Sequence, residues 1–407
     1  MADSKEPTAR CLDLTRLVSR VGRGAWTGVD RVEAAYLNHL LSLETPLFAL
    51  VRTRRNFTLL DHSGTKQLAE RLHGCRPWGS PDWRARSRLR ATKTRMAAES
   101  DLRRLGLDHT GRRSLASLLT RHLPDGCAYL NVGHSNLSDH VFLALRQVRD
   151  MHLSVLVHDM IPLDFPDFQR DGTVTSFAAK MRAVSRHADL VIYNSRQSQI
   201  SGAAHFGRMG RVPDSVVAHL GLDVPTVAGA VPSHLAQNRP YFVTVGTIEP
   251  RKNHALLLDV WAQMAKTRAA SEMPTLLIIG KRGWKNEKLF ARLDAQPAHV
   301  RELPDLSDAE MAALVAGAHG LLFPSFAEGF GLPPCEAAAL GTPVVVHDLP
   351  VYREILGKYP IYANVADIYL WEQIVTELAA RPATPVRGCD LILPSWDAHF
   401  NLVLKMT

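Results

Sequence analysis

Short apolar runs that alternate with amphipathic stretches constrain the fold of this chain more than any other feature. From about residue 126 onward, each run ends near Gly, Asp, Ser or Asn, and an amphipathic stretch follows it. Apolar side chains on consecutive positions suit strands that are buried on both faces, as in a parallel sheet covered by helices. We expect two sets of strands, the first over Ala128–Val132, Leu153–His158, Leu190–Asn194 and Val216–Leu220, and the second over Tyr241–Val245, Thr275–Ile279, Val300–Leu303, Leu321–Pro324 and Val344–His347.

The two sets of strands predict two α/β domains. Strands that alternate with helices form doubly wound sheets, and a chain of 407 residues suits two cores better than one. The proline-containing stretch Asp223–Pro240 separates the two sets and is interpreted as the linker. We expect an N-terminal domain over 1–225, a C-terminal domain over 240–385, and a final segment, 386–407, able to pack back on the N-terminal domain.

Positive charge is concentrated in one segment. Between Val51 and Arg113, fourteen Arg and two Lys stand against six Asp and Glu, so this segment carries +10 whereas the whole chain carries +8. We expect residues 52–113 to form a helix-rich excursion with few strands. Concentrated Arg attracts polyanions, so an anionic membrane surface or a phosphorylated acceptor is a candidate partner. A solvated face with local ion pairs explains the charge equally well. Nucleic acid is not expected, because no nucleic-acid motif accompanies the arginines.

Several negative features bear on location and cofactors. No apolar run approaches the roughly 20 residues that a membrane-spanning helix needs, and the first residues lack the apolar region of a secretory signal. The five cysteines are scattered without a CxxC pair, and no Asp-x-Asp pair follows a strand. We therefore expect a cytoplasmic protein, peripheral to the inner membrane face at most, that uses no metal or other cofactor.

The first chemical motif follows the run Tyr241–Val245. The segment from Gly246 to Lys252 stands between this run and the next amphipathic stretch, so it lies at the carboxyl edge of a parallel sheet, where ligands of α/β proteins bind. Gly246 permits close backbone approach, and Arg251 and Lys252 can neutralise a diphosphate near the N-terminus of the following helix. A basic loop that faces solvent is the alternative, and the position after a strand favours phosphate binding.

The second motif follows another predicted strand. Gly329 and Gly331 leave backbone N–H groups open to a ligand, and a helix expected to begin near Pro334 places its N-terminus behind them. Glu328 lies in the loop, and Glu336 lies one turn into the helix. Carboxylates accept hydrogen bonds from paired sugar hydroxyls, so the two could hold two sugars of one ligand. For Glu336 alone, stabilisation of the helix start is the simpler explanation.

Together, Glu328-x7-Glu336, the Gly-Phe-Gly-Leu-Pro loop and the preceding Gly-x4-Arg-Lys-Asn resemble the retaining glycosyltransferases of the GT-B fold, family GT4. The resemblance is closest to members that act on bacterial surface polysaccharides, often mannosyltransferases. It covers residues 153–348 well and the first 120 residues weakly. It implies two Rossmann-like domains that face each other across a cleft. It also implies metal-independent, retaining transfer of a hexose, with GDP-mannose as the expected donor, to a glycan or lipid-linked acceptor.

The resemblance also implies roles for residues of the C-terminal half. Arg251 and Lys252 would hold the leaving diphosphate beside Gly246. Many relatives carry Arg where this chain has Thr247, which removes a third cation from this binding site. The sugar and nucleoside of the donor would contact the second motif: Glu328 the hydroxyls of the transferred sugar, Glu336 the ribose hydroxyls, and Phe330, Gly331 and Leu332 the donor through their backbone N–H groups.

Two N-terminal segments resemble further parts of the family's site. His158 and Asp159 match a His-Asp turn after a strand, where His158 would approach the donor sugar from the acceptor side and Asp159 would help to bind substrate. Without the resemblance, capping of a strand end would explain both. Gly28 matches the glycine loop after the first strand and would approach donor phosphate or acceptor. Thr27 and Asp30 also have the spacing of a capping box.

Two other functions remain open at this point. The first is a sugar-nucleotide epimerase or a phosphorylase on the same two-domain scaffold. The second is a non-catalytic partner that binds a nucleotide-sugar or a polysaccharide, although the intact cations and both glutamates argue against it. A dehydrogenase is less expected, because no Gly-x-Gly-x-x-Gly follows a strand.

Overall fold

Two separate β-sheets organise the chain. The computed structural model describes residues 6–24, 26–54, 56–86, 92–223, 231, 233–237, 239–383 and 391–407. The first sheet contains, in spatial order, β4 (Asp108–Gly111), β3 (Asn56–Leu60), β2 (Leu47–Arg52), β1 (Arg10–Asp13), β5 (Ala128–Asn131), β6 (His152–Val157), β7 (Leu190–Tyr193) and β8 (Asp214–Val217). The second contains, in the same way, β11 (Val300–Leu303), β10 (Thr275–Ile279), β9 (Tyr241–Val245), β12 (Gly320–Phe323), β13 (Val344–Val346) and β14 (Ile361–Tyr362).

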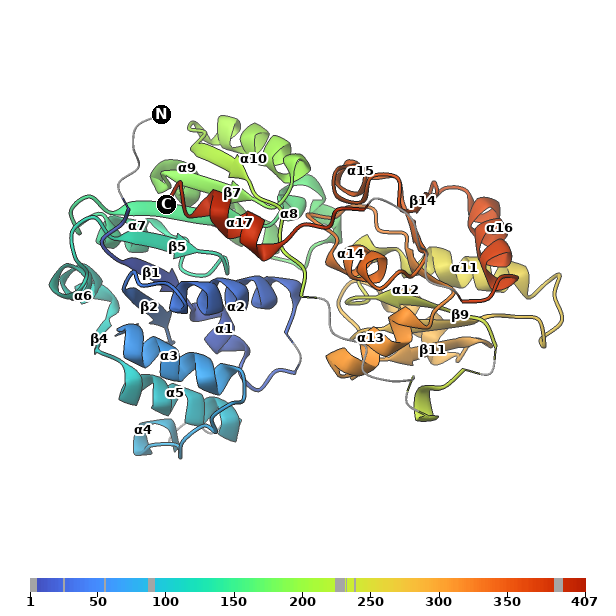
Figure 1. Cartoon of the computed structure of the whole chain (residues 1–407), viewed down its shortest axis with the longest axis horizontal. Coiled ribbons are helices and arrows are strands. Elements are labelled where there is room, and N and C mark those ends of the chain that lie inside the picture. Colours follow the sequence, from blue (N-terminus) through green and yellow to red (C-terminus); the bar gives the residue numbers. More distant parts are fainter. Residues whose placement is uncertain are drawn as a thin grey trace.

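Helices cover both sheets (Figure 1). Those that precede the second sheet are α1 (Thr15–Arg20), α2 (Gly28–Leu41), α3 (His62–Leu72), α4 (Trp83–Arg86), α5 (Lys93–Leu105), α6 (Leu115–His122), α7 (Asp139–Leu145), α8 (Ile161–Asp164), α9 (Thr173–His187) and α10 (Arg196–Met209). The others are α11 (His254–Met264), α12 (Glu287–Asp294), α13 (Asp308–Ala316), α14 (Leu332–Ala339), α15 (Pro350–Leu356), α16 (Ile368–Ala379) and α17 (Trp396–Val403). Short 3-10 turns cover Arg112–Ser114, Pro166–Phe168, Ser233–Leu235 and Pro250–Lys252.

Parallel pairing dominates both sheets. Every pair in the second sheet is parallel, and in the first sheet only β3 runs against its neighbours β2 and β4. Strands such as β10 and β12 are buried along their whole length, as their consecutive apolar residues predicted. The expected α/β architecture of two Rossmann-like domains is therefore confirmed.

The predicted strands agree with the structure where the apolar runs are long. They are wrong where hydrogen bonding to a neighbouring strand, and not an apolar run, determines the bounds of the strand. Tyr241–Val245 and Thr275–Ile279 are confirmed to the residue. The prediction of Val216–Leu220 is wrong in its bounds, because β8 begins at Asp214, which pairs with Leu190 of β7. Strand β1 was not predicted, since charged Arg10 and Asp13 form its ends, yet both are buried between two parallel neighbours.

The arginine-rich segment contains three helices and two short strands. Few strands were expected in residues 52–113, and the two that occur, β3 and β4, extend the first sheet beyond β2 by antiparallel pairing. Strand β3 follows β2 after a short turn, whereas the chain passes through α3, α4 and α5 before it returns to pair β4 with β3. Helices α3, α4 and α5 then form a layer of their own at this end of the molecule (Figure 1).

The chain crosses between the domains and then returns. Residues 224–230, 232 and 238 of the expected linker lie outside the described residues. At the other end of the chain, α17 packs on α2 of the N-terminal domain, as Figure 1 shows in red over blue. Its His399 Nε2 lies 2.7 Å from the hydroxyl of Tyr36, and its Phe400 ring stacks on His39 with centroids 3.9 Å apart. This packing places the C-terminal residues beside the first sheet.

Candidate functional site

An ion cluster joins the two sequence motifs of the C-terminal domain. Lys252 Nζ and Arg251 Nη1 each lie 2.7 Å from Glu328 Oε1. The two cations end the 3-10 turn after β9, and Glu328 lies in the loop after β12, the neighbouring strand. Loops at the carboxyl ends of neighbouring parallel strands lie side by side, so residues 76 positions apart in the sequence meet here.

The electrostatics of this cluster keep Glu328 ionised. Burial by itself would raise the pKa of Glu328, but the charges of Arg251 and Lys252 outweigh it and hold the pKa at about 2. A carboxylate with so low a pKa does not accept a proton at neutral pH, so Glu328 can orient and stabilise positive charge but cannot serve as a general base.

The two cations are used differently. Arg251 donates from Nε and Nη2 to Glu249, at 3.1 and 2.7 Å, and from Nη1 to the carbonyl of Ala327 at 2.6 Å. The only hydrogen bond that the structure records from Lys252 Nζ to a described residue goes to Glu328. Lys252 also lies against Gly246, where φ is +136° and an added Cβ would stand 3.7 Å from Nζ. Most N–H donors of Arg251 are therefore occupied by protein partners, whereas the ammonium group of Lys252 keeps N–H donors available beside Gly246.

The loop after β12 ends in a helix N-terminus. Gly331 caps α14 with a φ of +88°, and Tyr352 would collide with a Cβ at this position, so glycine is required here. Helix α14 begins at Leu332, two residues before the expected start. The structure records no hydrogen bond from the backbone N–H groups of Phe330, Gly331 or Leu332 to any described residue. These donors remain available to an anionic ligand.

The same loop touches the N-terminal domain. The backbone of Gly329 packs on the carbonyl of His158 so closely that a Cβ would overlap with it. Ser195 and Ser198 fasten this contact by donating their hydroxyl protons to the carbonyl oxygen of Gly329 at 2.8 and 3.3 Å. The contact therefore places the His-Asp turn, which follows β6, against the loop that also carries Glu328.

Both residues of that turn have shifted pKa values. Burial lowers the pKa of His158 to about 4, and its Nε2 lies 2.7 Å from the carbonyl of Val132. This hydrogen bond assigns the proton to Nε2 and leaves Nδ1 as an acceptor on a neutral ring. Burial raises the pKa of Asp159 to about 6, although the charge of Arg251 opposes the shift. Asp159 Oδ1 accepts from the backbone N–H of Ile161 at 3.0 Å.

A cavity of about 660 Å³ lies between the two domains beside this site. Val245 and Glu336 line it from the C-terminal domain, and Trp26 and Arg31 line it from the N-terminal domain. Glu336 Oε1 is ion-paired with Arg31 Nη1 at 2.5 Å. Burial raises the pKa of Glu336, and Arg31 partly offsets this. The volume is in the range of small-molecule sites, and one carboxylate oxygen of Glu336 is not used by Arg31.

Comparison with known proteins finds a family match in the C-terminal part. Residues 231–379 match the family model described as glycosyl transferases group 1. These residues of the C-terminal half are similar to that family. The motifs that suggested the resemblance, from Gly246 to Glu336, all lie within the matched residues.

Relatives extend the similarity toward the N-terminus. The chain is 31% identical over 271 residues to a serotype-specific mannosyltransferase, WbdA, from Escherichia coli, a match that spans 61% of this chain and 33% of WbdA. It is 26% identical over 243 residues to the O-antigen chain mannosyltransferase RfbU from Salmonella typhimurium, across 56% of this chain and 61% of RfbU. The chain thus spans between a third and two thirds of the length of these relatives.

A solved structure matches almost the whole chain. Anabaena Alr3699/HepE, crystallised with UDP and glucose, superposes with a TM-score of 0.63 across 98% of this chain and 99% of that one. At 15% sequence identity this likeness speaks for the fold alone. The expected resemblance to GT-B glycosyltransferases is confirmed at that level.

The glycine loop of the N-terminal domain faces the second motif. The capping box of Thr27 and Asp30 is confirmed, and it starts α2 at Gly28. Helix α1 lies between β1 and this loop. A Cβ on Gly28 would stand 3.1 Å from Leu332, so the N-termini of α2 and α14 face each other. Two positive helix ends therefore meet at the junction.

The remaining predicted residue lies apart from the ion cluster. Thr247 is exposed, and its methyl group packs near Gly283 of the loop after β10. Sequence reasoning gave no role to Arg31, although it lies one turn after Thr27, and it missed Glu249 entirely. Partners of this kind carry no sequence signal of their own, because they are defined by contacts across the fold.

The described residues contain neither a metal-binding cluster nor a helix able to span a membrane. In this part of the chain, no group of three or more His, Cys, Asp or Glu side chains is arranged to hold a metal ion. No helix among the described residues has the length and apolar composition needed to cross a bilayer. Metal independence and contact with a membrane both stay predictions.

Proposed function

We propose that this chain is a retaining glycosyltransferase that moves a hexose from a nucleotide-sugar to a glycan or lipid-linked acceptor in polysaccharide biosynthesis. Mannose from GDP-mannose is the donor that we expect, because relatives such as WbdA and RfbU are named mannosyltransferases. The observation that carries the proposal is the pairing of Lys252 with ionised Glu328 beside a neutral His158, next to a cavity of about 660 Å³.

The leaving diphosphate would lie between Lys252 and the N-terminus of α14. Lys252 keeps donors beside Gly246, and the backbone N–H groups of Gly331 and Leu332 are available to the same ligand. Fixed donors of this kind stabilise negative charge where it develops, without a cost of reorganisation. Arg251 acts mainly by holding Glu328 in place. This division of roles needs no bound metal.

Transfer with retention would follow a front-face path. The bond from the anomeric carbon to the diphosphate oxygen breaks, and the acceptor oxygen forms the new bond on the same face of the sugar. The acceptor proton passes to the departing diphosphate, since Glu328, with a pKa of about 2, cannot take it. Glu328 would stabilise the positive charge that develops on the sugar. His158 would accept a hydrogen bond from a sugar hydroxyl at Nδ1, which its neutral state leaves free.

Donor identity can be tested first. A panel of nucleoside diphosphates and nucleotide-sugars is added to the full chain, and the melting temperature is measured. A ligand that binds only the folded state raises the midpoint in proportion to its affinity. We expect GDP and GDP-mannose to give the largest shifts. A larger shift with UDP compounds would refute the guanine assignment, and the absence of any shift would argue against the proposed donor site altogether.

Catalysis can then be tested with matched variants. Glu328→Gln and Lys252→Ala should lower the rate of transfer by about 100-fold or more, as the loss of a group that acts on the transition state does. Glu302→Gln and Lys266→Ala are the controls, since half-buried Glu302 and exposed Lys266 lie in the same domain and form no contact with the ion cluster. Near-normal turnover in Glu328→Gln would contradict the assignment. Nuclear magnetic resonance of the product reports its anomeric configuration, and an inverted product would exclude the retaining mechanism.

A further inference from the structure

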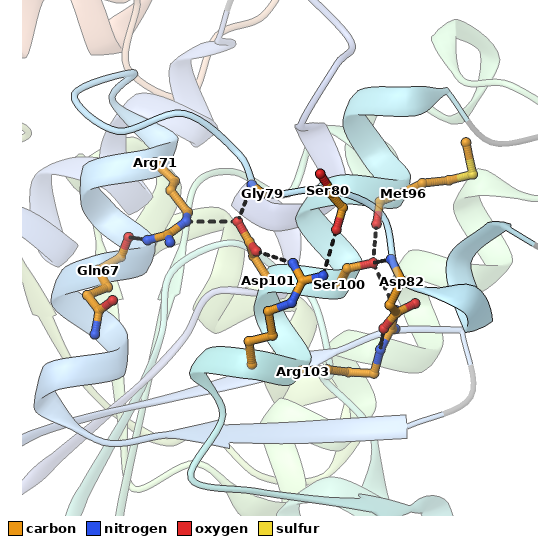
Figure 2. Close-up of polar contacts among 10 residues, drawn as sticks. Gln67, Arg71, Gly79, Ser80, Asp82, Met96, Ser100, Asp101 and Arg103 are labelled. Atoms are coloured by element: carbon orange, nitrogen blue, oxygen red, sulfur yellow. Dashed lines mark hydrogen bonds and ion pairs between the residues drawn. The ribbon is translucent and has the colours of Figure 1, made fainter.

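The described arginines of the arginine-rich segment differ in their partners. Figure 2 shows an ion network between α3, α5 and the residues before α4. Asp101 binds Arg71 and Arg104 at 2.9 and 2.7 Å, and Asp82 binds Arg103 at 2.6 Å. The alternative of local ion pairs therefore explains much of the charge in this segment. Arg88 and Arg90, which belong to the same segment, lie outside the described residues.

Arg52 behaves differently from this network. It is the last residue of β2, its side chain is exposed, and no described carboxylate lies within 4.0 Å of its guanidinium. The neighbouring strand β1 leads into Arg16, and the next strand, β5, leads into His134. Lys180 of α9 reaches the same place, where its Nζ donates to the carbonyl of His134 at 2.9 Å. Arg16, Arg52 and Lys180 thus gather at the carboxyl edge of the first sheet.

The positive charge of this group is only partly neutralised. Arg16 binds Asp30 at 2.8 Å, but Lys180 has no described carboxylate within 4.0 Å. Burial lowers the pKa of Lys180, and the charges of Arg16 and Arg52 lower it further. Like charges held together in this way oppose folding unless an anion offsets them. Their arrangement is therefore better explained by a ligand than by the stability of the empty fold.

The place of the group also restricts the ligand. His134 touches it through its carbonyl, and the His134 ring lies 5.0 Å from the ring of His158. The group of Arg16, Arg52 and Lys180 therefore adjoins the His-Asp turn, on the N-terminal side of the junction between the two domains. The groups assigned above to the donor, Lys252 and Glu336, belong to the C-terminal domain. An anion bound by Arg52 and Lys180 would accordingly belong to the other substrate.

We propose that Arg16, Arg52 and Lys180 bind a phosphate group of the acceptor, so that the acceptor is a phosphate or diphosphate ester of a sugar and not a neutral glycan end. This inference rests on the proposed function and names the acceptor class for the same site. Arginine matches phosphate oxygens with paired N–H donors, and lysine adds a point charge. The phosphate can be that of a lipid-linked sugar or of a free sugar phosphate, since both present the same anion.

A binding test separates this site from the donor site. Inorganic pyrophosphate is titrated into the Lys252→Ala protein by calorimetry, so that the diphosphate contact of the donor is already weakened. Adding Arg52→Gln or Lys180→Met to this background should weaken the remaining binding about tenfold or more. Arg182→Ala is the matched control, because Arg182 is exposed on the same helix as Lys180. Unchanged pyrophosphate affinity in Arg52→Gln, an exposed position that tolerates substitution, would overturn the inference.

A kinetic test addresses the acceptor directly. Transfer is measured to a sugar 1-phosphate, to the same sugar on a polyprenyl diphosphate, and to the unphosphorylated sugar. Arg52→Gln should raise the KM for whichever phosphorylated acceptor is used about tenfold, with the KM for the donor unchanged. The better phosphorylated acceptor identifies the source of the phosphate. An equal loss with the unphosphorylated sugar would refute the inference, whereas failure of every nucleotide to bind would refute the proposed donor site.

Discussion

Replacing Glu328 by Gln should reveal how strongly the ion cluster contributes to the C-terminal domain. The pKa of Glu328 falls from its usual 4.5 to about 2 in the folded protein, and its side chain is 8% exposed, so screening by solvent is weak. A lowered pKa means that the ionised form stabilises the fold, and that this stabilisation is complete above about pH 4.5 and is lost as the pH falls toward 2. At 1.36 kcal/mol for each pKa unit, the contribution is about 3 kcal/mol at pH 7 and about 2 kcal/mol at pH 3.5.

Denaturation by urea at both pH values measures this difference. Glu328→Gln keeps the volume of the side chain and removes its charge, so the free energy of unfolding should drop by about 3 kcal/mol at pH 7 and by less at pH 3.5. The buried Lys252 and Arg251 would also lose their shared counter-ion, which adds to the loss. Glu302→Gln, which breaks an exposed pair with Arg282, should cost no more than about 1 kcal/mol. Equal stability of Glu328→Gln and the wild type at pH 7, or a difference that grows as the pH falls, would refute this reasoning.

Three further predictions concern other parts of the site and its frame. Gly331→Ala should lower the free energy of unfolding by about 1–3 kcal/mol and reduce transfer, because φ is +88° and Tyr352 blocks a Cβ. Urea titration measures this change. Gly207→Ala is the control and should not destabilise the protein, because a Cβ there would meet open space. Phe400→Ala should cost about 3–5 kcal/mol by detaching α17, as a lowered melting temperature would show, and an unchanged midpoint would contradict it. Arg31→Ala removes the cation that opposes the raised pKa of Glu336, so Glu336 should be protonated at a higher pH than in the wild type. On acidification, the KM for the donor should therefore begin to rise at a higher pH. Identical pH profiles of the KM would contradict a role for Glu336 in donor binding.

The positions of the site loops could be predicted from the sequence. Apolar runs such as Tyr241–Val245 show that a strand is buried, and the residues that follow such a run must lie at one edge of a parallel sheet. Glycines and charged residues at that edge, such as Gly246 and Lys252, are then candidates for ligand contacts. This inference needs only local periodicity and the chemistry of side chains, which the sequence contains directly.

The division of labour within the site was decided by the tertiary structure. Arg251 and Lys252 are adjacent basic residues in the sequence, but only Arg251 donates hydrogen bonds to Glu249 and Ala327. Most of its N–H donors are therefore occupied by protein partners. Arg52 and Arg103 belong to one arginine-rich segment, yet Arg52 acts on Lys180 at the end of β2 and Arg103 binds Asp82. Such differences arise from partners that are distant in the chain. Sequence by itself determined which residues carry charge and where strands end, and the packing of two sheets decided which of those charges remain available to a ligand.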